Sequence, residues 1–171
     1  MSNRRHPHVV NLDEVEARMQ TKGTRFGGAS KRLGPHVGSE RLGCTMYEVE
    51  PGRRAFPFHF HCLTEGAVFV LEGEGTLRIG NDSVPVRAGD WIAFPVGPDN
   101  AHQLINTGDK LLRYLAVSAG STADVVGYPD SKKVAALATP THQPSPTTPP
   151  WIRFITREDA SVDYFDGEEI D

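Results

Sequence analysis

The stretch GRRAFPFHFHCLTEGAVFVLEG, residues 52–73, and the stretch GDWIAFPVGPDNAHQLIN, residues 89–106, decide how this chain folds. The first carries His59, His61 and Glu65, and the second carries His102 and Asn106. Three imidazoles and a carboxylate form a complete ligand set for a first-row transition metal. We therefore predict a single metal site to which both stretches contribute.

The geometry of a β-strand explains why the histidines can meet. Side chains two residues apart point the same way and lie about 6.6 Å apart along the chain, so His59 and His61 can converge while Phe60 faces away. His102 opens a later strand, and its ring points to the same side if that strand pairs beside the first. With Glu65 as a fourth ligand, one or two coordination positions stay open for water or substrate.

Short strands between glycine or proline turns surround these residues. About eight to ten residues per strand and turn is the rhythm of a β-sandwich or barrel, and no helical period occurs there. The candidate strands are 42–49, 56–61, 67–72, 75–79, 83–87, 91–94, 102–106 and 111–118. The sequence thus predicts an all-β barrel over residues 41–138.

The candidate strand 67–72 is apolar on both faces, which is typical of a strand covered on both sides. Residues 139–150 contain five prolines and predict an extended connector. Residues 151–171, with several aromatic side chains, are too apolar for a disordered tail. We expect this C-terminal extension to pack on the outer face of the barrel, on its own subunit or on a partner.

Residues 1–40 are predicted to form an N-terminal arm. Asn11 as a cap and Glu14 as its capping-box partner favour one short amphipathic helix. The glycines that follow, from Gly23 to Gly38, favour irregular backbone that crosses the surface of the barrel.

Composition narrows the class of protein. A chain of 171 residues, 38% of them hydrophobic, is long enough for one domain with a core. The formal net charge of −4 argues against a nucleic-acid partner. No apolar run is long enough to span a bilayer, and residues 1–10 do not resemble a signal peptide, so we expect no membrane association and a cytoplasmic location.

The charge is unevenly distributed. Basic residues gather in the first forty positions, and acidic residues gather between Glu158 and Asp171. The two ends are either separate solvated segments or segments that attract each other, within one subunit or between two. In the second case, we expect the association between the two ends to weaken in high salt.

The motif spacing Gly52-x6-His59-x-His61-x3-Glu65-x7-Gly73, followed by Gly89-x5-Pro95-x-Gly97-x4-His102-x3-Asn106, resembles the two conserved motifs of the cupin superfamily. The resemblance implies a small jelly-roll barrel, a homodimer and one divalent metal ion (Zn, Mn, Ni or Fe). The implied metal ligands are His59, His61, Glu65 and His102.

The chain looks most like a group of small single-domain cupins sometimes labelled sugar-phosphate isomerases. This likeness implies a metal-dependent enzyme of the isomerase type that acts on a small polar metabolite, such as a sugar phosphate. In such an enzyme Glu65 would move a proton. An Fe(II)-dependent dioxygenase and a non-catalytic small-ligand-binding cupin are the alternatives, because one fold carries many activities.

Two features of the motifs bear on the site. Counted back from Gly73, the metal-binding glutamate of the family falls on Gly66, and Glu65 lies one residue earlier. A one-residue offset turns a side chain to the opposite face, so Glu65 binds only if a turn or bulge restores its direction. Asn106, Tyr47 and Phe69 are the candidate substrate contacts; barrel core is the alternative for the two aromatic residues.

Overall fold

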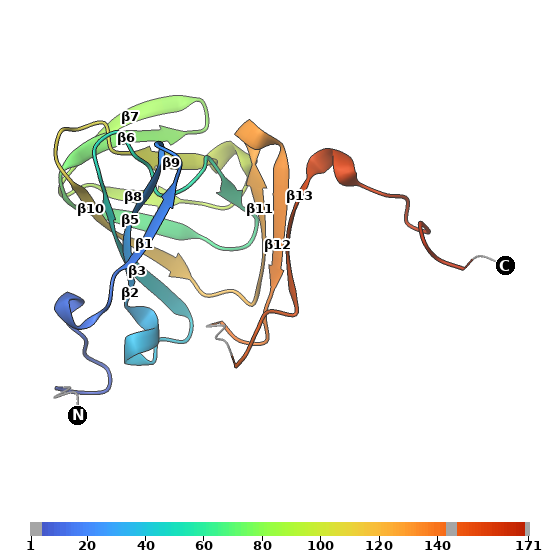
Figure 1. The fold of residues 1–171 in the computed structure, drawn as a ribbon, viewed down its shortest axis with the longest axis horizontal. Helices are drawn as coiled ribbons and strands as arrows, with labels where there is room; N and C mark the ends of the chain where they lie inside the picture. Colours follow the sequence, from blue (N-terminus) through green and yellow to red (C-terminus); the bar gives the residue numbers. More distant parts are fainter. Residues whose placement is uncertain (1–4, 143–146, 170–171) are drawn as a thin grey trace.

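The computed structural model describes residues 5–142 and 147–169. The described chain is built almost entirely of strands (Figure 1), with only short 3-10 turns between them. The strands are β1 Arg18–Lys22, β2 Phe26–Arg32, β3 Leu42–Val49, β4 Phe60–His61, β5 Gly66–Glu72, β6 Glu74–Ile79, β7 Asp82–Arg87, β8 Trp91–Phe94, β9 His102–Ile105, β10 Leu112–Ala119, β11 Ala123–Tyr128, β12 Lys133–Ala138 and β13 Ile152–Arg157. None of the described helices is long and apolar enough to cross a membrane.

Three antiparallel sheets form the molecule. A six-stranded sheet has the order β1-β2-β3-β10-β5-β8, a three-stranded sheet has the order β7-β6-β9, and a four-stranded sheet has the order β13-β12-β11-β4. The hydrophobic core lies between the first two sheets, because its members come from strands of both: Val49, Val68, Val70, Leu77, Val86, Ile92, Phe94, Leu112 and Tyr114. The all-β class predicted from the turn spacing is therefore confirmed.

The N-terminal arm differs from its prediction. Asn11 and Glu14 make the expected capping box: the Asn11 side chain accepts from the Asp13 amide (3.0 Å), and Glu14 accepts from the Asn11 amide (2.9 Å). The box closes only one 3-10 turn, η1 Leu12–Glu14, and no amphipathic helix follows. Instead β1 and β2 form a hairpin on β3, because the backbone groups of β2 pair with the edge of the sheet.

The outer face of β5 is not covered within the described chain. Val68 and Val70 point into the core, whereas Phe69 and Leu71, on the opposite parity, are 37% and 39% exposed. Phe69 lies across from Trp91 of β8, which is also exposed. The outer face of β5 is apolar, as the sequence predicted. The C-terminal extension of the same chain does not cover that face, because it pairs with β12 instead.

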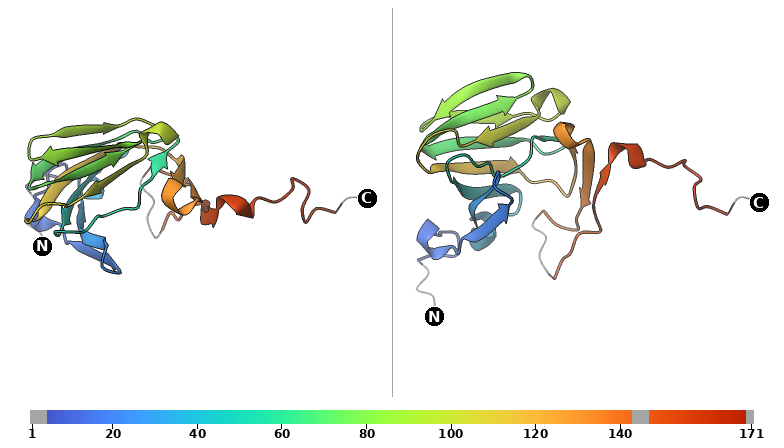
Figure 2. Two further views of the ribbon diagram at one scale, coloured as in Figure 1. Left: turned by 90° about the horizontal axis from the view of Figure 1, so that it is seen from above. Right: turned by 45° about the horizontal axis from the view of Figure 1, so that its top comes forward.

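The C-terminal extension pairs at the edge of the four-stranded sheet. β13 runs antiparallel to β12, with Ala135 opposite Ile155. Residues 158–169, which we call the C-terminal tail, run away from the body of the molecule, as the three views in Figures 1 and 2 show. The prediction for the connector falls partly on residues 143–146, which lie outside the described residues.

Candidate functional site

Three histidines from two separate segments meet at one place. His61 lies in β4, His59 lies just before it, and His102 opens β9. His59 and His102 form an antiparallel bridge in which each amide donates to the other's carbonyl, at 3.1 and 2.8 Å. Their ring centres are 4.6 Å apart, and the ring centres of His59 and His61 are 5.2 Å apart. The two sequence motifs therefore join through backbone hydrogen bonds.

The ring spacing fits a shared metal ion. An imidazole nitrogen binds zinc at about 2.0–2.1 Å, so two ring centres on one ion lie roughly 4.6–5.3 Å apart for angles at the metal between about 90° and 109°. Both measured spacings fall in that range. As the side chains stand, however, residues 5–142 and 147–169 contain no group of three or more His, Cys, Asp or Glu that could hold a metal ion. Two of the three ring pairs therefore have a spacing that suits a shared ion, and imidazole is a suitable donor, but the three side chains do not form a ligand group in their present positions.

Each histidine of the cluster is held by a hydrogen bond at Nδ1. The acceptors are the Pro57 carbonyl for His59 (2.8 Å), the Asp124 carboxylate for His61 (2.6 Å) and the Asn100 carbonyl for His102 (2.9 Å). Because carbonyl and carboxylate oxygens only accept, the proton lies on Nδ1 and the Nε2 lone pair is available. This is the tautomer that metal-binding histidines need, with the second nitrogen held by a neighbour.

Burial keeps two of these rings neutral. It lowers the pKa of His102 to about 4, against the opposing effect of the Asn100 carbonyl. It also lowers the pKa of His59, again against a carbonyl, that of Pro57. A neutral imidazole is the form that binds metals. Neither ring therefore has to lose a proton before it binds a metal ion at neutral pH.

Asp124 is the functional residue that the sequence prediction missed. It lies in β11, is buried, and also accepts from the Leu63 amide at 3.0 Å. Burial alone would raise its pKa, but hydrogen bonds from His61, Thr64 and Leu63 outweigh burial and hold the pKa below its ordinary value. The available signal was an isolated aspartate beside Val125 in an apolar run.

The three histidines line a cavity of about 410 Å³. Aromatic rings make much of its wall: Tyr47, Phe56, Phe94, Tyr114 and Tyr128. Among the described residues that line it there is no Lys, Arg, Asp or Glu. The cavity is therefore suited to a small, largely apolar and uncharged molecule.

The aromatic wall packs directly on the histidines. The Phe94 ring stacks on His102 with ring centres 3.7 Å apart, and Tyr128 stacks on His59 at 6.2 Å. Burial raises the pKa of Tyr47 and of Tyr128. Both hydroxyls therefore stay protonated and can donate hydrogen bonds to a bound oxygen.

The structure brings some of the other predicted residues to the cavity and not others. Tyr47 lines it, whereas Glu65, Phe69 and Asn106 do not. Glu65 is exposed, and its neighbours Thr64 and Gly66 line the wall instead, so no bulge restores its direction. Phe69 points outward from β5.

Asn106 is buried in a different role. Its side-chain amide donates to the carbonyls of Val49 (2.7 Å) and Lys110 (2.8 Å), and its side-chain oxygen accepts from the Gly108 amide (3.1 Å). It therefore holds together the turn between β9 and β10 and does not face a ligand.

The chain is similar to known proteins in sequence and fold. Residues 45–118 match the family model described as the cupin domain. A sugar phosphate isomerase from a cupin superfamily, from Silicibacter pomeroyi, is 26% identical with a TM-score of 0.73 over 92% of this chain and 98% of that one. A candidate sugar phosphate isomerase from Acidithiobacillus ferrooxidans is 29% identical with a TM-score of 0.69, over 76% and 86% of the two chains.

A third similar protein has a different name. Polyketide synthase CurC of Streptomyces cyaneus is 29% identical over 108 residues, which are 63% of this chain and 66% of that protein. The chain thus spans just under two thirds of the length of this curated relative.

Proposed function

We propose that this chain, whose residues 45–118 match the cupin domain model, is a small cupin and a metal-dependent enzyme of the isomerase type. Its substrate would be a small, flat, uncharged molecule that carries a carbonyl or hydroxyl oxygen. The observation that supports this proposal is the arrangement of His59, His61 and His102. Their Nδ1 atoms are all engaged, which leaves three Nε2 atoms for one ion at the wall of an aromatic cavity.

The residues of the chain would have distinct tasks. The three histidines would hold the ion, and Asp124 would fix the ring of His61. A bound divalent ion would supply a Lewis acid that polarises a substrate oxygen. Tyr47 and Tyr128 would donate hydrogen bonds to that oxygen or its neighbour, and the aromatic wall would exclude water.

The cavity wall argues for an aromatic or polyketide-like substrate over a sugar phosphate. A phosphate dianion placed there would find neither Lys nor Arg in the described lining, and the proposed metal ion would be engaged by the reacting oxygen. Burying such a charge unpaired costs several kcal/mol or more. Of the similar proteins, the one named polyketide synthase suits an aromatic cavity better than the two named sugar phosphate isomerases.

Elemental analysis of tag-free protein tests whether the chain binds a metal ion through the three histidines. We expect about one equivalent of a divalent first-row metal, lost on chelation and strongly reduced in His59→Gln, His61→Gln and His102→Gln. His6→Gln, at an exposed position in the arm, is the matched control and should keep the metal. A wild-type protein that takes up no divalent metal at saturation would overturn the metal-dependent function.

A metal-independent acid–base enzyme is the second candidate. The 2.6 Å hydrogen bond between His61 and Asp124 favours it, because a carboxylate on Nδ1 orients an imidazole to take up a proton at Nε2. Chelation separates the two candidates. Turnover of an aromatic keto or phenolic substrate that survives complete removal of metal would support the second and exclude the first.

A further inference from the structure

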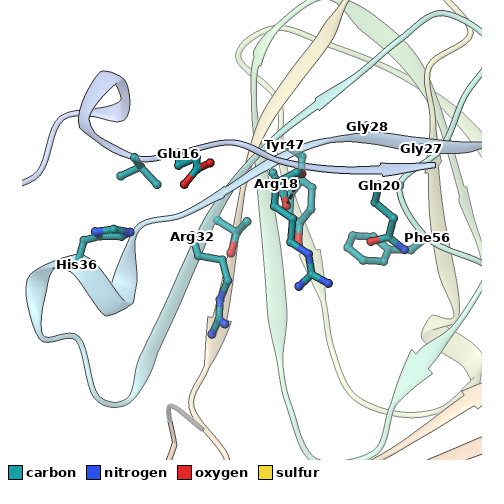
Figure 3. A pocket seen from close by; sticks show the side chains of 13 residues that line it. Glu16, Arg18, Gln20, Gly27, Gly28, Arg32, His36, Tyr47 and Phe56 are labelled. Atoms are coloured by element: carbon teal, nitrogen blue, oxygen red, sulfur yellow. Dashed lines mark hydrogen bonds between the residues drawn. The ribbon is translucent and has the colours of Figure 1, made fainter. Parts of the chain in front are cut away.

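A groove outside the histidine cavity remains without a role. It has a volume of about 310 Å³ and lies where β1 and β2 cross β3. Its charged lining residues are Glu16, Arg18 and Arg32, so its formal charge is positive, and His36 also lines it. Figure 3 shows the side chains of Arg18 and Arg32 extending toward the same side, from two neighbouring strands. We call this region the arginine groove.

The arginine groove also has an apolar floor. Tyr47 and Phe56 line it and also line the histidine cavity, so these two rings form the wall between the two spaces. Val15 adds a further apolar side chain. A ligand for this groove therefore needs negative charges together with apolar or aromatic groups.

The C-terminal tail has this composition. Residues 158–169 contain six acidic residues and no Lys or Arg, together with Val162, Tyr164 and Phe165. Every residue from Arg157 to Glu169 is exposed, and Tyr164 is 88% exposed. Tyr164 and Phe165 contact each other and together expose an apolar surface, which is a feature of interaction sites.

The tail does not reach the groove of its own chain. Figures 1 and 2 show it running away from the body, while β1 and β2 lie on the far side of the molecule. A second copy of the chain offers the same groove to this tail. Two copies related by a two-fold axis would make the contact twice, each tail in the groove of the other copy.

We propose that the arginine groove is the docking site for the C-terminal tail of a second copy of this chain, so that two copies exchange tails in a reciprocal dimer. Acidic side chains of the tail face Arg18 and Arg32, and its aromatic residues pack on the floor formed by Tyr47 and Phe56. The docked tail thereby covers the outer side of the wall of the histidine cavity in the partner.

Paired charge reversals test this arrangement. The groove variant is Arg18→Glu with Arg32→Glu. The tail variant is Asp163→Lys, Asp166→Lys, Glu168→Lys and Glu169→Lys, which changes the formal charge of residues 163–169 from −4 to +4. In each variant alone, groove and tail carry the same sign, so we expect the dissociation constant of the dimer to rise at least about tenfold. When the two variants are mixed, each tail meets a groove of opposite sign, and we expect a heterodimer to form with affinity restored toward the wild type.

Sedimentation velocity over a range of salt concentrations measures both effects. Because exposed charges are screened over a Debye length of about 10 Å at 0.1 M salt, wild-type association should weaken as salt is raised. Asp109→Lys with Lys110→Glu, on an exposed turn, is the matched control and should associate like the wild type. A wild type that stays monomeric, or variants that dimerise alone as well as they do mixed, would overturn the proposal.

A cross-link tests the geometry independently of charge. Cysteines at Gln20, which lines the groove, and at Tyr164 of the tail should form a disulfide between subunits on mild oxidation in a background of Cys44→Ser and Cys62→Ser. A covalent dimer is the expected product. A disulfide that forms only within one chain would show that the tail returns to its own groove and would also contradict the proposal.

Discussion

Nδ1 of His61 and Oδ2 of Asp124 lie 2.6 Å apart, although 63 residues separate them along the chain. The contact exists because β4 pairs with β11, with His61 opposite Val126. Two neighbouring strands of the four-stranded sheet thus determine both the direction of the His61 ring and the nitrogen that carries its proton.

Replacing Asp124 by Asn should weaken metal binding. The amide has the shape of the carboxylate but not its charge, so it holds the His61 ring less firmly and makes Nε2 less basic. We expect a loss of about 10–100-fold in metal affinity, measured by competition with a chromogenic chelator. Asp130→Asn, which removes an exposed partner of Arg78, is the control and should bind like the wild type.

Replacing Glu65 by Gln should leave metal content unchanged. Glu65 is exposed and lies outside the cavity, while its two neighbours line the wall. Elemental analysis of Glu65→Gln beside His102→Gln makes the comparison direct. Loss of metal from the glutamine variant at position 65 would mean that the strand shifts by one residue when metal binds.

Asn106→Ala should destabilise the fold without altering ligand choice. The substitution leaves the carbonyls of Val49 and Lys110 and the amide of Gly108 without their partner in a buried place. We expect the free energy of unfolding to fall by about 2–3 kcal/mol in urea titrations. Asn81→Ala, in an exposed turn, should change it by less than about 0.5 kcal/mol.

The metal-free protein should lose stability in acid. The pKa of His102 is about 4 in the folded chain and 6.5 as its ordinary value, so the unfolded chain binds more protons between these pH values. The contribution of His102 to the free energy of unfolding is then fully present above pH 6.5. It falls as the pH drops toward 4, by an amount on the order of 3 kcal/mol. The lowered pKa of His59 acts in the same direction.

Urea unfolding of chelator-treated protein at pH 7.5, 6 and 5 measures this dependence. His102→Gln should show a shallower fall between pH 7.5 and 5 than the wild type. Parallel curves for the two proteins would show that His102 titrates normally in the fold.

Substitutions at Gly127 and Phe60 should have non-additive effects on the free energy of unfolding and on metal binding. A Cβ at Gly127 would collide with the Phe60 ring directly across the β4–β11 pair. We expect Gly127→Ala to cost about 1–3 kcal/mol and to weaken metal binding, because His61 adjoins the displaced ring. The double variant Gly127→Ala with Phe60→Leu should recover part of both losses, as measured by a double-mutant cycle. Additive losses would contradict a direct contact.

The local sequence pattern was sufficient to predict the bounds of several strands of the barrel. The strands Leu42–Val49 and Trp91–Phe94 match their predicted bounds, because alternating side chains and flanking turn residues are local signals. The N-terminal arm was predicted less well. Its glycines suggested irregular backbone, yet β2 forms there, since the open edge of β3 supplies hydrogen-bond partners that no local pattern reports.

The amino-acid sequence by itself determined the all-β class and the meeting of His59, His61 and His102, because residue spacing along a strand sets which side chains share a face. Only the tertiary structure decided that Glu65 points away, that Asn106 is structural and that Asp124 holds His61. These outcomes depend on which strands become neighbours. Pairing between distant segments is a property of the whole packed chain and not of any local stretch.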